Sequence, residues 1–110
     1  MDDAAYITSL VDRARAAQAV FERDFDQAGV DAILRDMAKV TFFKAEELAR
    51  LAVEETRMGN YESKVKKIQG KSRIFWYALR GRKSMGILGR DEETGITEIA
   101  KPVGVVGAVQ

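Results

Sequence analysis

Adjacent acidic side chains are the residues in this sequence whose types could do chemistry. Carboxylates occur together at Glu46–Glu47, Glu54–Glu55 and Asp91–Glu93, and a pair of carboxylates can act as general acid and general base. Successive residues on a helix point about 100° apart, so the two helical pairs do not converge on one proton. The third set falls in a turn-rich segment. We therefore interpret all three as solvated helix faces and turn residues.

The side chains that most often carry catalysis are absent from the sequence. Its 110 residues include no cysteine and no histidine, which removes the thiol nucleophile, the commonest general base and the commonest metal ligand. Without cysteine there is also no disulfide framework. From the residues alone we assign no catalytic residue and no metal site.

Positive charge is concentrated in the middle of the chain, although the net charge is only +1. Nine Lys or Arg and no acid lie between Ser63 and Arg90, whereas the first 62 residues carry thirteen acids and eight bases. Together with Phe75, Trp76 and Tyr77, this run would suit phosphate contacts and base stacking. The alternative is a solvated basic helix face with its aromatic rings toward the core or a subunit. We favour the second interpretation, because charge runs usually indicate solvation.

The spacing of apolar residues predicts four helices in the first 80 residues. The first runs from Asp3 to Arg23, and a carboxylate at Asp2 or Asp3 can accept the free amides of its opening turn. Asp26 caps the second helix, whose inner face carries Val30, Ile33, Leu34 and Met37. The β-branched and aromatic run Val40–Phe43 predicts a break after it.

Two glycines and an asparagine are expected to set the ends of the third and fourth helices. The third spans Lys44–Met58, and Gly59 takes the left-handed position that follows it. Its inward side chains are expected to be Leu48, Leu51 and Ala52. Asn60 caps the fourth helix, which stops at Gly81 and in which Gly70 predicts a kink or a close contact. Its apolar residues at helical spacing are Val65, Ile68, Phe75 and Leu79.

The pattern changes from a period of 3.6 to a period of 2 after the fourth helix. Ser84–Leu88 and Ile96–Ala100 are expected to form a β-hairpin around the turn-rich segment 89–95. Pro102 then precedes Val103–Val109, a valine and glycine run typical of a strand that is covered on both faces. A parallel strand needs neighbours delivered by crossover connections, so we expect the other strands of its sheet to lie outside these residues.

Three stretches of the sequence carry a family resemblance. They are LVDRARAAQAVF, LARLAVEETRMGNYESKVKK and GILGRDEETGITEIAKPVGVVGAVQ. KPVGVVGAV resembles a signature of the aldehyde dehydrogenase superfamily, and VEETRMGNYESKV with DEETGITEIAKPVGVVGAV is similar to its CoA-acylating, acetaldehyde dehydrogenase-like branch. The resemblance covers nearly the whole chain, in order, and it is to the N-terminal part of that family. One departure is Arg57, where the family usually has the glycine of ETGMGN, and we expect it to be tolerated if residue 57 is helical.

The resemblance implies an α/β parent fold with a Rossmann-type cofactor domain. Residues 1–110 would be the N-terminal segment of the NAD-binding domain, with about four helices, a β-hairpin and one sheet strand, and 83–100 would be part of the arm used in subunit contacts. The catalytic domain would be absent. In the family, a cysteine thiolate attacks an aldehyde, NAD takes the hydride and CoA takes the acyl group. The cysteine, the nucleotide-binding glycine turn and an oxyanion-stabilising asparagine lie beyond the matched region. The resemblance therefore implies no catalytic residue here, and places Val109 and Gln110 at the edge of the NAD cleft.

The resemblance also sets expectations for partners and location. We expect an N-terminal fragment of a homo-oligomeric oxidoreductase, inactive and binding neither NAD nor CoA by itself, whose partner is the remainder of the enzyme. A membrane or nucleic-acid partner is not expected. The expected location is the cytoplasm, either within a bacterial microcompartment or outside one. The alternative function is a stand-alone helical interaction or nucleic-acid-binding module. The aldehyde substrate stays open among acetaldehyde, longer aldehydes, succinate semialdehyde and sulfoacetaldehyde.

Overall fold

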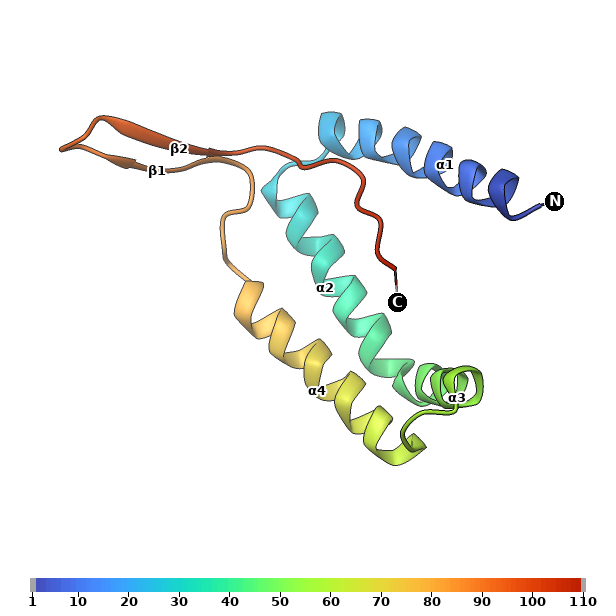
Figure 1. The fold of residues 1–110 in the computed structure, drawn as a ribbon. Coiled ribbons are helices and arrows are strands. Elements are labelled where there is room, and N and C mark those ends of the chain that lie inside the picture. The colour runs from blue at the N-terminus through green and yellow to red at the C-terminus, as the bar shows by residue number, and fades with distance from the viewer. Residues whose placement is uncertain (1, 110) are drawn as a thin grey trace. The chain divides into compact units, whose positions relative to one another are not determined.

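A computed structural model describes residues 2–109 as four α-helices and one two-stranded antiparallel sheet (Figure 1). The elements are α1 Asp3–Asp24, α2 Gln27–Phe43, α3 Ala45–Thr56, α4 Tyr61–Leu79, β1 Gly86–Asp91 and β2 Ile96–Ala100. The chain divides into two units, Met1–Ala28 with Lys83–Gln110, and Gly29–Arg82. The first unit holds α1, the hairpin and the tail (residues 101–109), and the second holds most of α2 together with α3 and α4.

The helix α1 begins where the sequence predicts. The side chain of Asp2 accepts a hydrogen bond from the backbone N–H of Ala5 at 2.6 Å, which satisfies one of the amides that the first turn leaves free. Near the other end, the ring centroids of Phe21 and Phe25 lie 5.2 Å apart. The helix ends at Asp24, one residue after the predicted end.

The hairpin forms as predicted, with a shorter loop. β1 and β2 pair antiparallel, with Asp91 opposite Ile96. The loop is shorter than predicted because β1 continues past Leu88 to Asp91. The remaining loop, residues 92–95, is closed by a hydrogen bond from the N–H of Gly95 to the carbonyl of Asp91 at 2.8 Å. Gly95 has a φ of +71°, a conformation that glycine adopts without the clash that a Cβ atom would cause.

The tail forms no strand in the part of the chain that the structure describes. The sequence predicts a strand covered on both faces, yet three of the four valines of its apolar run, Val103, Val106 and Val109, are 89%, 75% and 101% exposed. A strand requires a hydrogen-bonded neighbour. The only sheet formed by residues 2–109 is the hairpin, so no described segment supplies that neighbour.

One side chain joins the start of α2 to the segment that leads into β1. The side-chain carbonyl oxygen of Gln27 accepts a hydrogen bond from the backbone N–H of Ser84 at 2.8 Å. Its amide nitrogen donates to the hydroxyl of the same serine at 3.1 Å. Asp26 directly precedes α2, at the place where the sequence predicts a cap. The side-chain amide of Gln27 thus holds the start of α2 to Ser84 through both its oxygen and its nitrogen.

The helix α2 continues through Val40–Phe43, so the predicted break there is wrong. The hydroxyl of Thr41 donates a hydrogen bond to the carbonyl of Met37 at 2.8 Å, which accommodates this β-branched residue within the helix. β-Branched and aromatic residues weaken a helix by less than about 0.7 kcal/mol each. The helical path bends one residue later, at Lys44 (φ −94°, ψ 9°), and α3 begins at Ala45.

Small side chains carry the packing of α3 on α4. Ala45 and Ala49 are 1% and 0% exposed, and among residues 2–109 they are the only buried apolar residues. The predicted inner residues Leu48 and Leu51 are instead 40% and 55% exposed, and only Ala52 of that set is half-buried. The predicted face is therefore wrong, because α3 presents to α4 the alanines, which permit a close approach of the two backbones.

The helix α4 begins at its predicted cap. The side chain of Asn60 accepts a hydrogen bond from the N–H of Ser63 at 2.9 Å. The helix continues without interruption through Gly70, and a Cβ atom placed there would meet no neighbour within 4 Å. The expected kink or close contact is therefore not found. Of the four predicted inner residues, two are half-buried and two are exposed: Val65 and Ile68, then Phe75 and Leu79.

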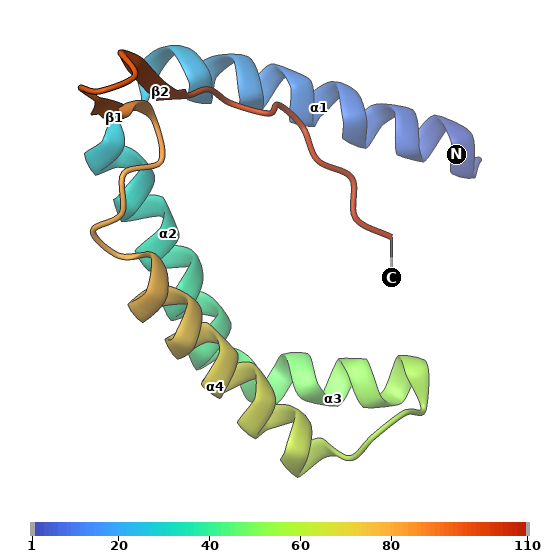
Figure 2. The ribbon, with the colours of Figure 1, turned by 60° about the vertical axis from the view of Figure 1, so that its left-hand side comes forward.

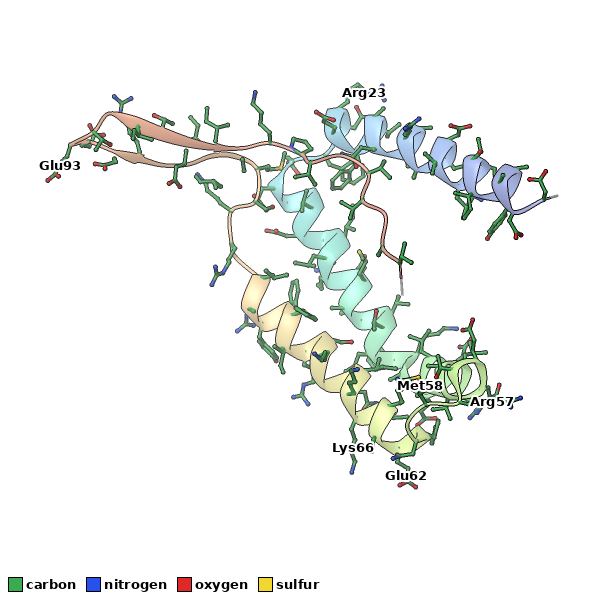
Figure 3. All side chains as sticks on the ribbon, viewed as in Figure 1. Arg23, Arg57, Met58, Glu62, Lys66 and Glu93 are labelled. Carbon is green, nitrogen blue, oxygen red and sulfur yellow. The ribbon has the colours of Figure 1, made fainter. Side chains whose placement is uncertain are left out.

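Arg57 ends α3 in a left-handed backbone conformation, with φ 54° and ψ 27°. Its N–H donates a hydrogen bond to the carbonyl of Val53 at 2.8 Å. Figure 3 shows Arg57 and Met58 at the corner between α3 and α4. The expectation that residue 57 is part of the right-handed helix is therefore wrong, and Gly59 (φ +75°) is the second left-handed residue of this corner. A side chain in this conformation costs roughly 1–2 kcal/mol.

We expect Arg57→Gly to stabilise the chain by about 1 kcal/mol, because glycine adopts the left-handed conformation without the clash of a Cβ atom. Urea unfolding of the 110-residue chain measures this change. Arg57→Ala is the matched control, since it removes the guanidinium but keeps the Cβ atom, and it should give little or no gain. An equal gain from Arg57→Ala would show that the side-chain charge, and not the backbone, is responsible.

The hairpin turn is expected to weaken in acid. Hydrogen bonds from the Thr94 side chain, and then from the backbone N–H groups of Glu93 and Thr94, hold the pKa of Asp91 below its ordinary value of 3.8. Because the folded-state pKa is the lower one, this stabilisation is present above the ordinary value and is lost as the pH falls through the lowered value.

The amide chemical shifts of Gly95 and Ile96, followed from neutral to strongly acidic pH, measure this loss. Asp91→Asn keeps an acceptor oxygen but removes the titrating group, so it should abolish the acid transition at these two amides. The same transition in Asp91→Asn would contradict the assignment to Asp91.

Candidate functional site

The predicted cofactor edge falls at the end of the tail. Val109 is fully exposed, so it contributes to no enclosed site within the described residues. Gln110 lies outside the residues that the structure describes. The expectation that these two residues border an NAD cleft therefore stays a prediction.

A cavity of about 700 Å³ lies between α1 and the tail, within the first unit. One wall is formed mainly by Ala14, Ala17 and Phe21 of α1 and by Phe25, which follows the helix. The tail contributes Gly104, Val105 and Val106. The half-buried Gly104 has a φ of +89°, so this part of the tail depends on glycine. The apolar run of the tail thus lies beside the apolar face of α1, although no strand is formed.

This cavity does not fit a dinucleotide by itself. A pyrophosphate is held by backbone N–H groups at a helix N-terminus or by cationic side chains. No Lys or Arg lines the cavity, and the N-terminus of α1 is capped by the carboxylate of Asp2. An apolar wall of this kind suits packing against other apolar elements, so we derive no catalytic step through NAD from the described residues.

The glycines near the hairpin set backbone geometry. Gly81 and Gly86 have φ values of +74° and +71°. Gly86 begins β1 and Gly89 lies inside it, so none of the three precedes a helix as in a phosphate-cradling loop.

The three carboxylate sets lie where the sequence predicts, in the first and last turns of α3 and at the hairpin loop. Glu47 forms an exposed ion pair with Lys44 at 3.0 Å, and Asp91 accepts hydrogen bonds from the turn. Within residues 2–109, no group of three or more potential ligands could hold a metal ion.

None of the described helices is both long enough and apolar enough to cross a membrane.

The basic run occupies α4 and the segment after it. Lys67 and Lys71 line a groove between α2 and α4 together with Phe75. Trp76 is half-buried, whereas Phe75 and Tyr77 are exposed. The expectation that this surface does not bind nucleic acid stays a prediction.

A second cleft between α2 and α4 was not predicted from the sequence. We call it the aromatic cleft. It has a volume of about 310 Å³ and is lined chiefly by Arg35, Lys39, Phe42, Phe43, Arg73, Trp76 and Tyr77. Figure 2 shows α2 and α4 side by side. The sequence analysis missed this cleft because it predicted a break at Val40–Phe43 and so did not place the two phenylalanines on α2. The aromatic runs FF and FWY were the signal in the sequence that could have indicated it.

The chain is similar to acylating dehydrogenases over nearly its whole length. No family model matches the chain. The chain is 38% identical over 108 residues to the succinate-semialdehyde dehydrogenase (acetylating) of Clostridium kluyveri. The aligned region makes up 98% of this chain and 24% of that protein. It is 40% identical over 105 residues to the sulfoacetaldehyde dehydrogenase (acylating) of Cupriavidus necator. That aligned region makes up 94% of this chain and 21% of that protein.

The solved structure of an acetylating aldehyde dehydrogenase from Geobacillus thermoglucosidasius has the same fold over this region. The TM-score is 0.83 at 36% sequence identity, and the match covers 91% of this chain and 22% of that one. The chain thus spans between a fifth and a quarter of the length of these relatives. Sequence and structure agree that the chain matches an N-terminal part of the acylating branch of the aldehyde dehydrogenase superfamily.

Proposed function

We propose that this chain builds the N-terminal part of the cofactor domain in a CoA-acylating, NAD-dependent aldehyde dehydrogenase. The observation that carries the proposal is the alignment of 98% of the chain with an acetylating dehydrogenase, together with the shared fold of an acetylating aldehyde dehydrogenase. In the proposed reaction, an aldehyde, CoA and NAD⁺ give an acyl-CoA, NADH and a proton. The names of the relatives support the acylating chemistry, and NAD is part of the proposal.

The contribution of the chain to this reaction is structural. It contains no cysteine, so the nucleophile of an acyl transfer must come from elsewhere in the enzyme, and by itself the chain would be inactive. Its own residues supply the apolar face of α1 and the valines of the tail beside it. When neighbouring strands pair with the tail, its free N–H and C=O groups would be satisfied and its valines would be buried.

The hairpin is the part of the chain that we assign to subunit contacts. Ile87 of β1 and Ile96 and Ile99 of β2 are all more than half exposed. A two-stranded hairpin is marginally stable alone, and three or more strands with an apolar face are needed for independent stability. Exposed isoleucines on such a hairpin therefore support its burial against another part of the enzyme or a second subunit.

A chimera tests the proposal. Residues 1–110 would replace the matching N-terminal segment of the Geobacillus thermoglucosidasius acetylating aldehyde dehydrogenase, and NADH formation from acetaldehyde would be measured with and without CoA. We expect CoA-dependent NADH formation within about tenfold of the unmodified enzyme, because the grafted segment supplies the same fold and no reacting group. The isolated 110-residue chain should form no NADH.

A matched chimera carrying Val105→Asp and Val106→Asp tests whether activity depends on the valines of the tail. It shows whether the enzyme would accept any grafted segment at this position. Two carboxylates would be placed in a strand that the proposal buries, so this chimera should lose activity and soluble yield. Full activity in this variant would contradict the burial of the tail. A soluble chimera of native oligomeric state that produces no NADH would contradict the proposed function.

A further inference from the structure

Four aromatic side chains line the aromatic cleft. Phe42 and Phe43 lie edge to face at the end of α2, with ring centroids 5.5 Å apart and an interplanar angle of 86°. Trp76 and Tyr77 of α4 line the cleft opposite them. Phe42 and Trp76 are half-buried, while Phe43 and Tyr77 are open to solvent. Faces and edges of several rings in one cleft favour the stacking of a planar aromatic group.

Three cationic side chains also line the aromatic cleft. Arg35 and Lys39 are one helical turn apart on α2, and Arg73 lies on α4. No Asp or Glu lines the cleft. Arg35 pairs with Asp36 at 3.4 Å, whereas Lys39 and Arg73 form no ion pair with any residue in the range 2–109. Two cations are thus available to an anionic ligand.

The surroundings strengthen this positive potential. The guanidinium carbon of Arg80 lies 4.5 Å from the ring centroid of Tyr77, and no acid occurs between Ser63 and Arg90. Fixed charges of one sign around a cleft attract ligands of the opposite sign. Within the second unit, apolar ring surface and unpaired positive charge therefore coincide at the aromatic cleft.

We propose that the aromatic cleft binds a small aromatic anion. Its ring lies among Phe42, Phe43, Trp76 and Tyr77, and its carboxylate, sulfonate or phosphate group lies near Lys39 and Arg73. A volume of about 310 Å³ is at the lower end of the range for small-molecule sites, which favours a ligand of one or two rings over a peptide. The proposal does not depend on the dehydrogenase function, because no residue of the tail or hairpin takes part.

The single tryptophan of the chain reports on the site directly. Trp76 is the only tryptophan, so its indole N–H gives one cross-peak in a ¹H–¹⁵N spectrum of the 110-residue chain. The probes are naphthalene-2-sulfonate and the neutral naphthalene-2-sulfonamide, which share their rings and differ in charge. We expect a saturable shift of the Trp76 cross-peak with the sulfonate, about tenfold weaker binding of the sulfonamide, and weaker sulfonate binding as salt is added.

A charge-matched pair of double variants locates the anion. Lys39→Gln with Arg73→Gln should weaken sulfonate binding by about tenfold and leave sulfonamide binding unchanged. Lys66→Gln with Arg82→Gln removes the same charge from residues that do not line the cleft, and it should leave both affinities unchanged. Figure 3 shows Lys66 pointing away from α2. Circular dichroism establishes that each variant retains its helices.

Three results would overturn the proposal. The absence of a saturable shift at millimolar sulfonate would show that the cleft binds no such ligand. Equal affinity for the two probes would show apolar contact without anion recognition. Equal weakening by the two double variants would assign the effect to the overall charge of the chain and not to Lys39 and Arg73.

Discussion

The contact between α3 and α4 depends on two alanines, and the second unit is organised around it. Ala45 and Ala49 lack the bulk that would hold the helices apart, so α3 approaches α4 closely enough to bury both methyl groups. A helix of twelve residues is marginal in water by itself, so α3 depends on this packing. Arg57 and the cap at Asn60 form the ends of the corner that returns the chain to α4.

Much of the remaining apolar surface has no partner within the described residues. Ile87 and Ile99 of the hairpin and Val103 and Val106 of the tail are largely exposed. Large contiguous apolar surface is rare on soluble monomers and usually marks an interaction site. The proposed role in a larger dehydrogenase accounts for this surface, since neighbouring strands and subunits would cover it. The part of the family represented here would then be a scaffold, with its chemistry supplied by residues outside the matched region.

The cavity beside the tail and the aromatic cleft differ in chemical character. The cavity between α1 and the tail is apolar and lacks cations, which is consistent with packing against other elements of a fold. The aromatic cleft combines four rings with three cations. Lys39 and Arg73 are solvated cations beside apolar rings, so an aromatic anion would replace part of their hydration while burying ring surface. The same second unit can therefore serve both a scaffold and a separate binding site.

Local sequence determined the caps at Asp2 and Asn60 and the turn around Gly95, because each depends on hydrogen bonds between residues at most four positions apart. The motif KPVGVVGAV with its neighbours also indicated the family. For the site, however, the sequence led only to Val109, which is exposed, and to Gln110, outside the described residues.

Tertiary structure alone decided that α3 buries Ala49 and not Leu48, and that Phe42 and Phe43 line the same cleft as Trp76 and Tyr77. Which face of a helix is buried depends on the element that packs against it. That element is a separate segment of the chain, and helical periodicity and capping do not show where it packs.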